Sequence, residues 1–239
     1  MIEKITGSSY QKFVTENIFA PLGMKDSGYD SNAAILPHRA SGYSRGPAGL
    51  VNADHINMTV SLSVGGLYST MQDLLKWEQG LFGGKLQPAS LQKMIAPFKN
   101  NSAFGLQVET KRGHQMIDHN GGIEGFNTEL EYYPDDQLTI AVLADVNGPV
   151  PDQIAAQLAA VAHGETVTLQ NERKEVPADP KVLARYVGAY QLAPGMSFLI
   201  TLEGNQLVSK LGPQPQVPIF PQSETMFFAE GGGCSDRIY

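Results

Sequence analysis

The sequence predicts an α+β protein in which an antiparallel sheet with flanking helices is followed by a small all-β domain. Two observations lead to this prediction. Apolar residues recur at helical spacing in the N-terminal part of the chain, whereas from Ala103 onward they alternate with polar residues at a period of two. The polar stretch 165–180 contains two prolines and is typical of a linker, and short period-two segments resume beyond it.

Helices are predicted in four places along the first domain. Ser8 and Gln11 form a capping box, so the first helix should run from Ser8 to Phe19, where Pro21 stops it. The stretch 25–63 is rich in Gly, Ser, Asn and Pro and should form long irregular loops. The later helices are expected over 71–81, 88–96 and 151–164.

The predicted sheet precedes the last of these helices. Its strands are expected over 104–109, 114–119, 127–133 and 138–144, as an antiparallel meander. The following helix carries Ile154, Leu158 and Val161 on one face, which we expect to cover one side of the sheet. In the second domain, strands are expected over 187–191, 198–203, 206–211 and 226–229.

Composition and charge exclude several classes of protein. The chain has 17 Lys+Arg against 24 Asp+Glu and no basic run, so no nucleic-acid partner is expected. No apolar run approaches the ~18 residues of a membrane helix, and the chain as given starts without a signal-peptide pattern, so we expect no membrane segment. The compartment is not indicated. Cys234, the single cysteine, cannot form an internal disulfide.

No cofactor and no metal site is predicted. His114, Asp118 and His119 are ligand types, but neighbouring residues of an extended strand face opposite ways, so the side chains of Asp118 and His119 should diverge. The remaining histidines stand alone in the sequence, where surface or capping roles are expected. They are His38, His55 and His163.

A glycine-rich turn holds the densest group of chemically capable residues. It reads His119-Asn120-Gly121-Gly122-Ile123-Glu124-Gly125-Phe126 and follows a predicted strand. Glycine lets a backbone approach a ligand closely, and free N–H groups at such a place stabilise an oxyanion. A hairpin loop that merely needs glycine would have the same residues, so both interpretations stay open.

Four blocks of this sequence resemble the β-lactamase-related serine hydrolases, a family that includes penicillin-binding proteins, esterases and D-amino-acid peptidases. The blocks are Ile2-Glu3-Lys4-Ile5-Thr6-Gly7, Pro21-Leu22-Gly23-Met24, Gly65-Gly66-Leu67-Tyr68-Ser69-Thr70-x-x-Asp73-Leu74, and His119-x-Gly121-Gly122 with Gly125-Phe126. The resemblance implies a β-lactamase/transpeptidase-like domain over 1–164 that is incomplete at its N-terminus. The segment 181–239 is similar to the small lipocalin-like β domain that often follows in such proteins. That domain looks truncated, because 231–239 continues no strand pattern.

The resemblance also implies roles for individual residues. Family members combine a Ser-x-x-Lys nucleophile, a Tyr-x-Asn pair and a Lys-or-His-x-Gly motif, and the first two would fall before Met1. By resemblance, His119 would bind substrate and assist proton transfer. Gly121 and Gly122 would bind substrate, with the Gly122 N–H as an oxyanion donor. The histidine in place of lysine favours the esterase-like or peptidase-like members.

These implications predict the C-terminal part of a serine hydrolase that acts on ester or amide bonds through an acyl-serine. Its substrate would be a small-molecule ester, an amide or a peptide. Without the two missing motifs the chain should be inactive as given, and a complementing N-terminal polypeptide is one expected partner. The alternative is a non-catalytic binding module that keeps the glycine-rich cleft.

A third hypothesis is ester hydrolysis by a serine of this chain. Ser90-Leu91-Gln92-Lys93 spells Ser-x-x-Lys, but Lys93 falls nearly opposite the apolar stripe of its helix and should face water. Ser69 precedes a helix, and its offset to Gln72 predicts an N-cap. Tyr43-Ser44-Arg45 lacks the amide of Tyr-x-Asn, so a loop with an aromatic anchor is expected there.

Overall fold

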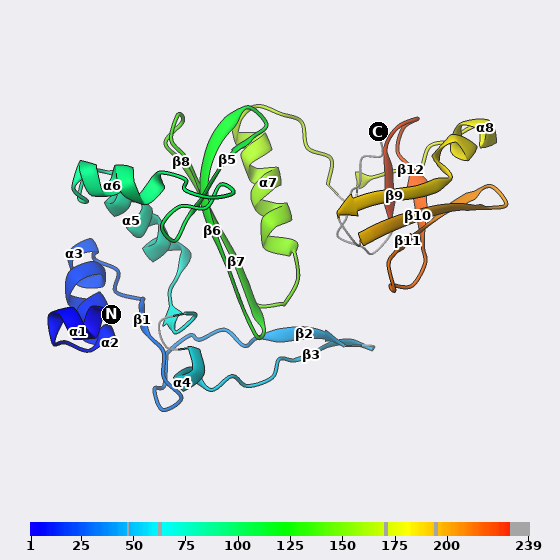
Figure 1. Ribbon diagram of the computed structural model, residues 1–239. Helices are drawn as coiled ribbons and strands as arrows, with labels where there is room; N and C mark the ends of the chain where they lie inside the picture. Colours follow the sequence, from blue (N-terminus) through cyan, green and yellow to red (C-terminus); the bar gives the residue numbers. More distant parts are fainter. Residues whose placement is uncertain (47, 62–63, 170–171, 194–195, 230–239) are drawn as a thin grey trace. The chain divides into compact units, whose positions relative to one another are not determined.

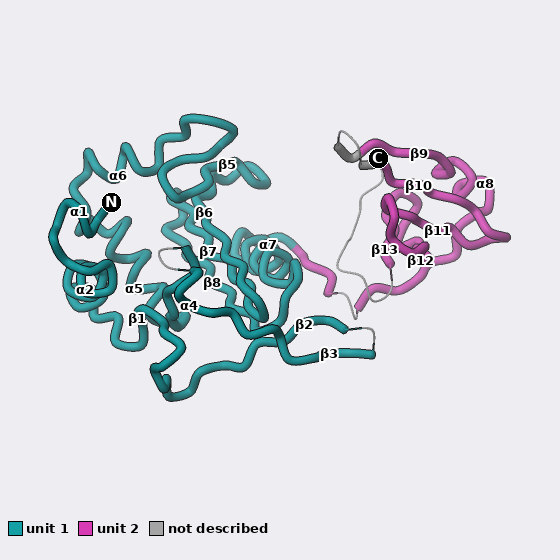
Figure 2. Tube along the Cα trace, turned by 60° about the horizontal axis from the view of Figure 1, so that its bottom comes forward, with its two compact units in different colours: residues 1–165 teal, residues 166–239 magenta. Residues whose placement is uncertain are grey.

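The computed structural model describes residues 1–46, 48–61, 64–169, 172–193 and 196–229. The chain divides into two compact units, Met1–Glu165 and Thr166–Tyr239 (Figure 2). The tail 231–239, whose pattern matched no strand, lies outside the described residues. None of the helices in the described part combines the length and the hydropathy that crossing a bilayer requires.

An antiparallel meander forms the centre of the first unit (Figure 1). Its strands are β5 (Gln107–Lys111), β6 (His114–Ile123), β7 (Phe126–Tyr133) and β8 (Leu138–Ala144), in the order β5-β6-β7-β8. The predicted sheet is confirmed, although β6 continues through the glycines to Ile123 rather than ending at His119. Consequently the glycine-rich segment is mostly strand, and only Glu124 and Gly125 form the turn.

Helices cover both faces of this sheet (Figure 1). On one face α7 (Val150–Ala162) closes a core that contains Met116, Tyr133, Ile140, Val142, Ala155 and Ala159. On the other face lie α5 (Met71–Phe82) and α6 (Pro88–Ile95), with Ala103, Val108 and Ile117 buried beneath them. There the ring of Phe82 stacks on Tyr132 with 3.9 Å between ring centroids.

The prediction of which face of α7 covers the sheet is wrong. Ile154, Leu158 and Val161 are 40%, 49% and 59% exposed, whereas Ala155 and Ala159 pack on the sheet at 0% and 5%. Alanine lets the helix backbone approach the strands closely, and the larger apolar side chains consequently form an outward stripe. Periodicity identified the stripe correctly but not the neighbour that it faces.

Two helical stretches form the N-terminal part, α1 (Ile2–Thr6) and a continuous run of α2 (Tyr10–Val14), a π-helical turn (Thr15–Phe19) and α3 (Ala20–Leu22). The continuous run is the helix expected over 8–19. Its N-cap is Ser9 rather than Ser8, since the Ser9 side chain accepts from the Lys12 N–H. Pro21 does not stop the helix at Phe19, because the residues after the π-helical turn stay helical to Leu22. Gly23 ends the helix at φ 68.

The region predicted as irregular loops contains short elements. They are β1 (Gly28–Tyr29), the hairpin of β2 (Tyr43–Gly46) with β3 (Gly49–Asn52), and α4 (Met58–Ser61). β1 pairs with β4 (Leu67–Tyr68). The partner of β1 lies far along the chain, which explains why local periodicity did not predict β1.

A fully buried Asp73 joins α5 to the segment before β1. Its Oδ2 accepts from the Asp26 N–H and the Ser27 hydroxyl at 2.8 Å each, and its Oδ1 accepts from Lys76 Nζ at 2.6 Å. Three donors compensate the burial of the charge. Thr70 caps α5 by accepting from the Asp73 N–H, so the predicted N-cap Ser69 is wrong by one residue.

The second unit is a five-stranded antiparallel sheet in the order β13-β12-β11-β10-β9. Its strands are β9 (Gly188–Ala193), β10 (Met196–Glu203), β11 (Gln206–Leu211), β12 (Val217–Pro221) and β13 (Phe227–Ala229). β12 was not predicted, because prolines at both its second and last positions demote such a segment on sequence grounds. Two short helical turns were also missed, α8 (Pro180–Leu183) and a 3-10 turn (Ala184–Tyr186), and Leu183 joins the core of this sheet.

Two substitutions on α7 test which of its faces packs on the sheet. We expect Leu158→Ser to change the free energy of unfolding by less than about 0.5 kcal/mol, since the side chain is half exposed. Ala159→Leu should destabilise by about 1–3 kcal/mol, because it adds volume against the strands. Urea unfolding followed by circular dichroism measures both. A larger loss for Leu158→Ser than for Ala159→Leu would reverse the assignment of faces.

Candidate active site

The predicted site residues lie on the second half of β6 (Figure 1). In the ladder with β7, His119 is opposite Leu130, Gly121 is opposite Thr128 and Gly122 is opposite Asn127. His119 is exposed whereas its neighbour Asp118 is buried at 9%, so the two side chains face opposite sides of the sheet as expected for an extended strand. Accordingly, Asp118 does not orient His119.

One side of β6 is open where the glycines lie. The register with β5 ends at the pair Gln107–Asp118, and no strand in the described part of the chain pairs with the same edge over 119–123. Ile123 and Phe126 flank a two-residue turn and therefore form a hydrogen-bonded pair. Because such pairs alternate, the N–H of Gly122 points away from β7 and toward the open edge.

Close packing explains the glycines at two of these positions. A Cβ at residue 121 would lie 2.6 Å from Thr128 Oγ1, and one at residue 125 would lie 2.6 Å from the Cα of Gly42. Gly125 also has φ +82, which side-chain-bearing residues rarely adopt. At Gly122 the nearest atom to a Cβ would be 3.2 Å away, so there the backbone is crowded only slightly.

Asn147 fixes the turn next to the glycines. Its Oδ1 accepts from the Gly125 N–H at 2.7 Å and from the Ser44 hydroxyl at 3.1 Å. Its Nδ2 donates to the Ile123 carbonyl at 2.9 Å and to Asn127 Oδ1 at 3.0 Å. One side chain thus holds the β6–β7 turn, β7 and the β2–β3 hairpin together. Sequence reasoning missed it, since these partners lie 20 or more residues away.

Backbone hydrogen bonds dock the β2–β3 hairpin at the same place. The Tyr43 N–H donates to the Asp145 carbonyl at 2.8 Å, and the Tyr43 carbonyl accepts from the Asn147 N–H at 3.1 Å. The Gly42 carbonyl accepts from the Ala53 N–H at 3.0 Å. The segment Tyr43-Ser44 therefore supports the glycine turn, although it belongs to strand β2 and not to the loop that was expected.

Three carboxylates lie on the opposite face of the sheet, under α7. Burial raises the pKa of Asp118 to about 6 and that of Glu129 to about 8, and the Asp152 side chain contributes to the latter. Glu131 is fully buried and accepts from the Tyr133 hydroxyl at 2.9 Å, with Lys111 Nζ at 3.5 Å. Asp118 Oδ1 has no hydrogen-bond partner within the described residues. These groups therefore lie on the face of the sheet opposite to the His119 side chain.

The Beta-lactamase family model matches residues 1–164. The chain belongs to the β-lactamase family of serine hydrolases. It is 27% identical over 255 residues to Penicillin-binding protein 4* of Bacillus subtilis. This alignment covers 95% of this chain and 56% of that protein. It is 25% identical over 187 residues to a D-aminopeptidase of Brucella anthropi, covering 75% of this chain and 35% of that one.

Solved structures show the same fold. The octameric penicillin-binding protein homologue from Pyrococcus abyssi superposes with a TM-score of 0.62 at 22% identity, over 95% of this chain and 55% of that one. The chain therefore spans about half the length of these relatives. The family relationship and the mixed fold with antiparallel sheets confirm the resemblance that the four sequence blocks carried.

Neither Ser90 nor Ser69 forms a nucleophile–base pair in the described structure. Ser90 and Lys93 are both exposed on α6, as expected for Lys93. Ser69 Oγ lies 2.8 Å from Ser27 Oγ, and Ser27 in turn donates to the buried Asp73. These hydrogen bonds anchor α5, so the hydroxyl of Ser69 has a structural role.

Ligand-type residues do meet elsewhere on this sheet. His114, at the start of β6, lies beside Asp136 and His163. His163 caps the C-terminus of α7 as predicted, but it does not stand alone. Sequence spacing gave no signal for this group, because its members are 22 and 27 residues apart along the chain.

Loss of the Asn147 side chain should loosen the glycine turn. We expect Asn147→Ala to destabilise the first unit by about 1–3 kcal/mol, because several partly buried polar groups lose their partner. Amide hydrogen exchange should speed up at Gly125 in particular. Asn120→Ala, at an exposed site on the same strand, is the matched control. Equal protection of Gly125 in both variants would contradict the role assigned to Asn147.

The buried carboxylates predict a pH dependence of stability. Asp118 and Glu129 have folded-state pKa values of about 6 and 8, above the ordinary carboxyl value of about 4. The folded state therefore retains protons that the unfolded state releases, so this contribution is full below pH 4 and is lost as pH rises through 6 to 8. We expect a higher urea midpoint at pH 5 than at pH 8.5. Glu129→Gln should flatten this difference, whereas Glu124→Gln at an exposed site should not.

Proposed function

We propose that this chain provides the substrate-binding edge of a serine hydrolase that cleaves ester or amide bonds through an acyl-serine. Its substrates are small-molecule esters, amides or peptides. The observation that carries the proposal is the open side of β6, where the Gly122 N–H and the exposed His119 lie on one short stretch of strand. Residues 1–164 form the partial hydrolase domain, 165–180 the linker and 181–239 the lipocalin-like domain.

In this reaction a serine Oγ attacks the carbonyl carbon and the carbonyl oxygen takes the negative charge. The Gly122 N–H donates to that oxygen, and removal of one such donor lowers the rate about 10²–10³-fold in other hydrolases. The bond between the carbonyl carbon and the leaving oxygen or nitrogen then breaks, and His119, which binds the substrate, helps the serine proton reach that leaving atom. Water then releases the acyl group from the serine. Gly121 contributes by leaving room, since a side chain there would collide with Thr128.

The relatives support this class of substrate. Two relatives of this chain are named as a penicillin-binding protein and a D-aminopeptidase. Because this chain covers 56% and 35% of their lengths, their activities bear on it only as a proposal. We infer that Ser-x-x-Lys and Tyr-x-Asn come from a further polypeptide segment, and that residues 1–239 alone do not turn over substrate.

Two surfaces of the first unit suit that segment. β8 is an edge strand of its sheet, which leaves one row of its backbone N–H and C=O groups without a strand partner in the described structure. The outward stripe of α7 is a second exposed surface with apolar side chains, and Leu143 of β8 is 38% exposed. A partner that adds a strand to β8 and an apolar face to α7 would satisfy both. We propose such a polypeptide as the complementing partner.

Chemical labelling separates an incomplete enzyme from a self-sufficient one. The purified chain should not react with a fluorophosphonate probe and should hydrolyse a p-nitrophenyl ester only at the background rate. Co-expression with the polypeptide encoded directly upstream, where that carries both motifs, should produce labelling on the added serine. Labelling of the chain alone that disappears in Ser90→Ala or Ser69→Ala would overturn the proposal. A complex that forms but remains unlabelled would favour the non-catalytic binding module.

The donor role of Gly122 has its own test in the completed enzyme. Gly122→Pro removes the N–H and should lower kcat about 10²–10³-fold. Gly122→Ala keeps the N–H, and its Cβ would meet only the amide of Asn127 at 3.2 Å, so it serves as the matched control. Equal activity of the two variants would show that this N–H does not hold the oxyanion.

A further inference from the structure

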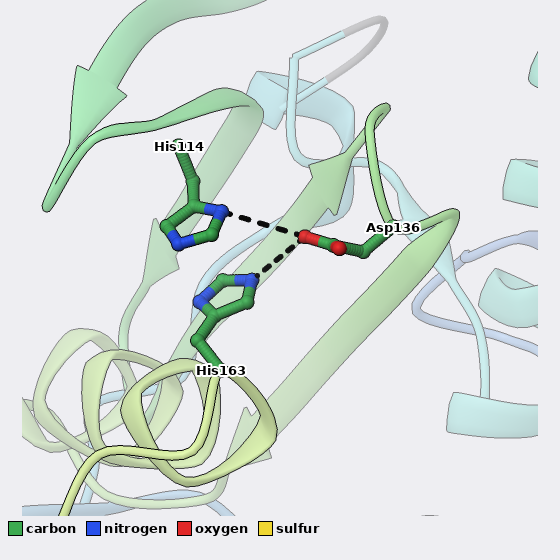
Figure 3. A group of neighbouring side chains, drawn as sticks. All are labelled: His114, Asp136 and His163. Atoms are coloured by element: carbon green, nitrogen blue, oxygen red, sulfur yellow. Dashed lines mark hydrogen bonds and ion pairs between the residues drawn. The ribbon is translucent and has the colours of Figure 1, made fainter.

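We propose that His114, Asp136 and His163 bind a divalent transition-metal ion, with zinc as the best match to their donors. The three side chains come from the start of β6, the turn between β7 and β8, and the C-cap of α7 (Figure 3). Each offers one ligand atom, and these atoms all lie within 4.8 Å of one another. No other set of at least three such residues occurs in the described part of the chain.

The spacing of the ligand atoms fits a small tetrahedral ion. Asp136 Oδ2 lies 3.4 Å from His114 Nδ1 and 3.1 Å from His163 Nε2. With metal–ligand bonds of about 2.0–2.1 Å, neighbouring ligands of a tetrahedral zinc ion lie about 3.3 Å apart. Two imidazoles and one carboxylate form a common zinc donor set that leaves the fourth position for water.

Both rings already present a nitrogen to the carboxylate (Figure 3). They are stacked with 3.7 Å between centroids and 3° between planes. A metal lies in the plane of each imidazole that binds it, so binding requires the two rings to tilt out of this parallel stack. The His163 side chain is only 7% exposed and has the edge of Tyr133 against it, whereas the side chains of His114 and Asp136 are 34% and 45% exposed. His163 is therefore the fixed ligand, and the other two adjust.

The nearby cations do not oppose a bound metal strongly. Arg112 forms an ion pair with Glu165, and Lys111 lies near Glu131 at 3.5 Å and Glu109 at 3.9 Å. Both positive side chains thus have carboxylate partners of their own. The Asp136 carboxylate is shared only by the two imidazoles among the contacts that the structure describes.

The role of this ion would be structural. His114 and His119 are five residues apart on β6, which is roughly 16 Å along an extended strand. An ion at His114 therefore does not reach a substrate at the open edge. It would instead join the first residue of β6, the β7–β8 turn and the end of α7. These three parts of the first unit lie more than 20 residues apart along the chain. The site is independent of the proposed hydrolase activity.

Metal titration of the full chain tests this site without any activity assay. Metal-free protein is titrated with Co²⁺ alone, and tetrahedral binding should give intense absorption between about 500 and 650 nm with one ion per chain. Calorimetry with Zn²⁺ should give the same stoichiometry, and Zn²⁺ should raise the thermal midpoint. His163→Gln and Asp136→Asn should each weaken binding at least about tenfold. His55→Gln, which removes an exposed histidine far from the group in sequence, is the control.

Several outcomes would overturn the site. They are the absence of stoichiometric binding, binding that both variants leave unchanged, and equal weakening by His55→Gln. If His163→Gln does not fold, Asp136→Asn still decides, because Asp136 is exposed in a turn. A thermal midpoint that responds to pH but not to Zn²⁺ would mean that the three side chains form only a hydrogen-bonded group. None of these results depends on whether the chain hydrolyses an ester.

Discussion

The register of β5 against β6 determines which backbone groups of β6 are left without a strand partner. β5 pairs with β6 only from His114 to Asp118, whereas β7 pairs with β6 from Ile117 to Ile123. Within the described structure β6 is consequently paired on both sides only at Ile117 and Asp118, with β5 alone before them and with β7 alone after them. From His119 to Ile123 the side of β6 that β5 leaves has no strand partner in the described structure, and His119, Gly121 and Gly122 lie there. A longer β5 would have satisfied the backbone groups on that side within the sheet.

The sheet could be predicted from the sequence because each strand pairs with the next one along the chain and its apolar residues alternate regularly. The four strands of the meander, α5, α6 and α7 were all expected, with errors of a few residues at their ends. Two of the missed features involve partners far along the chain. β1 pairs with β4, and the β2–β3 hairpin is bound through Tyr43 to residues 145–147, which follow β8. β12 forms in spite of its prolines because β11 and β13 lie on either side of it.

The same limit applies to the site. The glycine-rich segment could be proposed as a site from residue types alone, since glycine and histidine at that spacing carry a chemical meaning. Asn147 could not, because asparagine after a strand is ordinary and its four partners belong to other segments. The outward face of α7 shows the reverse error. Its larger apolar residues indicated a core, but Ala155 and Ala159 pack on the sheet instead. An apolar stripe identifies a buried face only when the neighbour is known.

The positions of the two unsatisfied surfaces constrain any polypeptide that completes this domain. β8 is one of the two edge strands of the sheet, whereas the open side of β6 faces the opposite way and lies two strands from β8. At about 4.8 Å between neighbouring strands, β6 and β8 are roughly 10 Å apart. A strand added to β8 therefore cannot place a nucleophile beside Gly122. Under the proposed function, a completing segment would contact the sheet twice, once along β8 and the apolar face of α7, and once at the glycines of β6. A single continuous helix or strand would not do both, so such a segment would need at least two elements with a crossing connection.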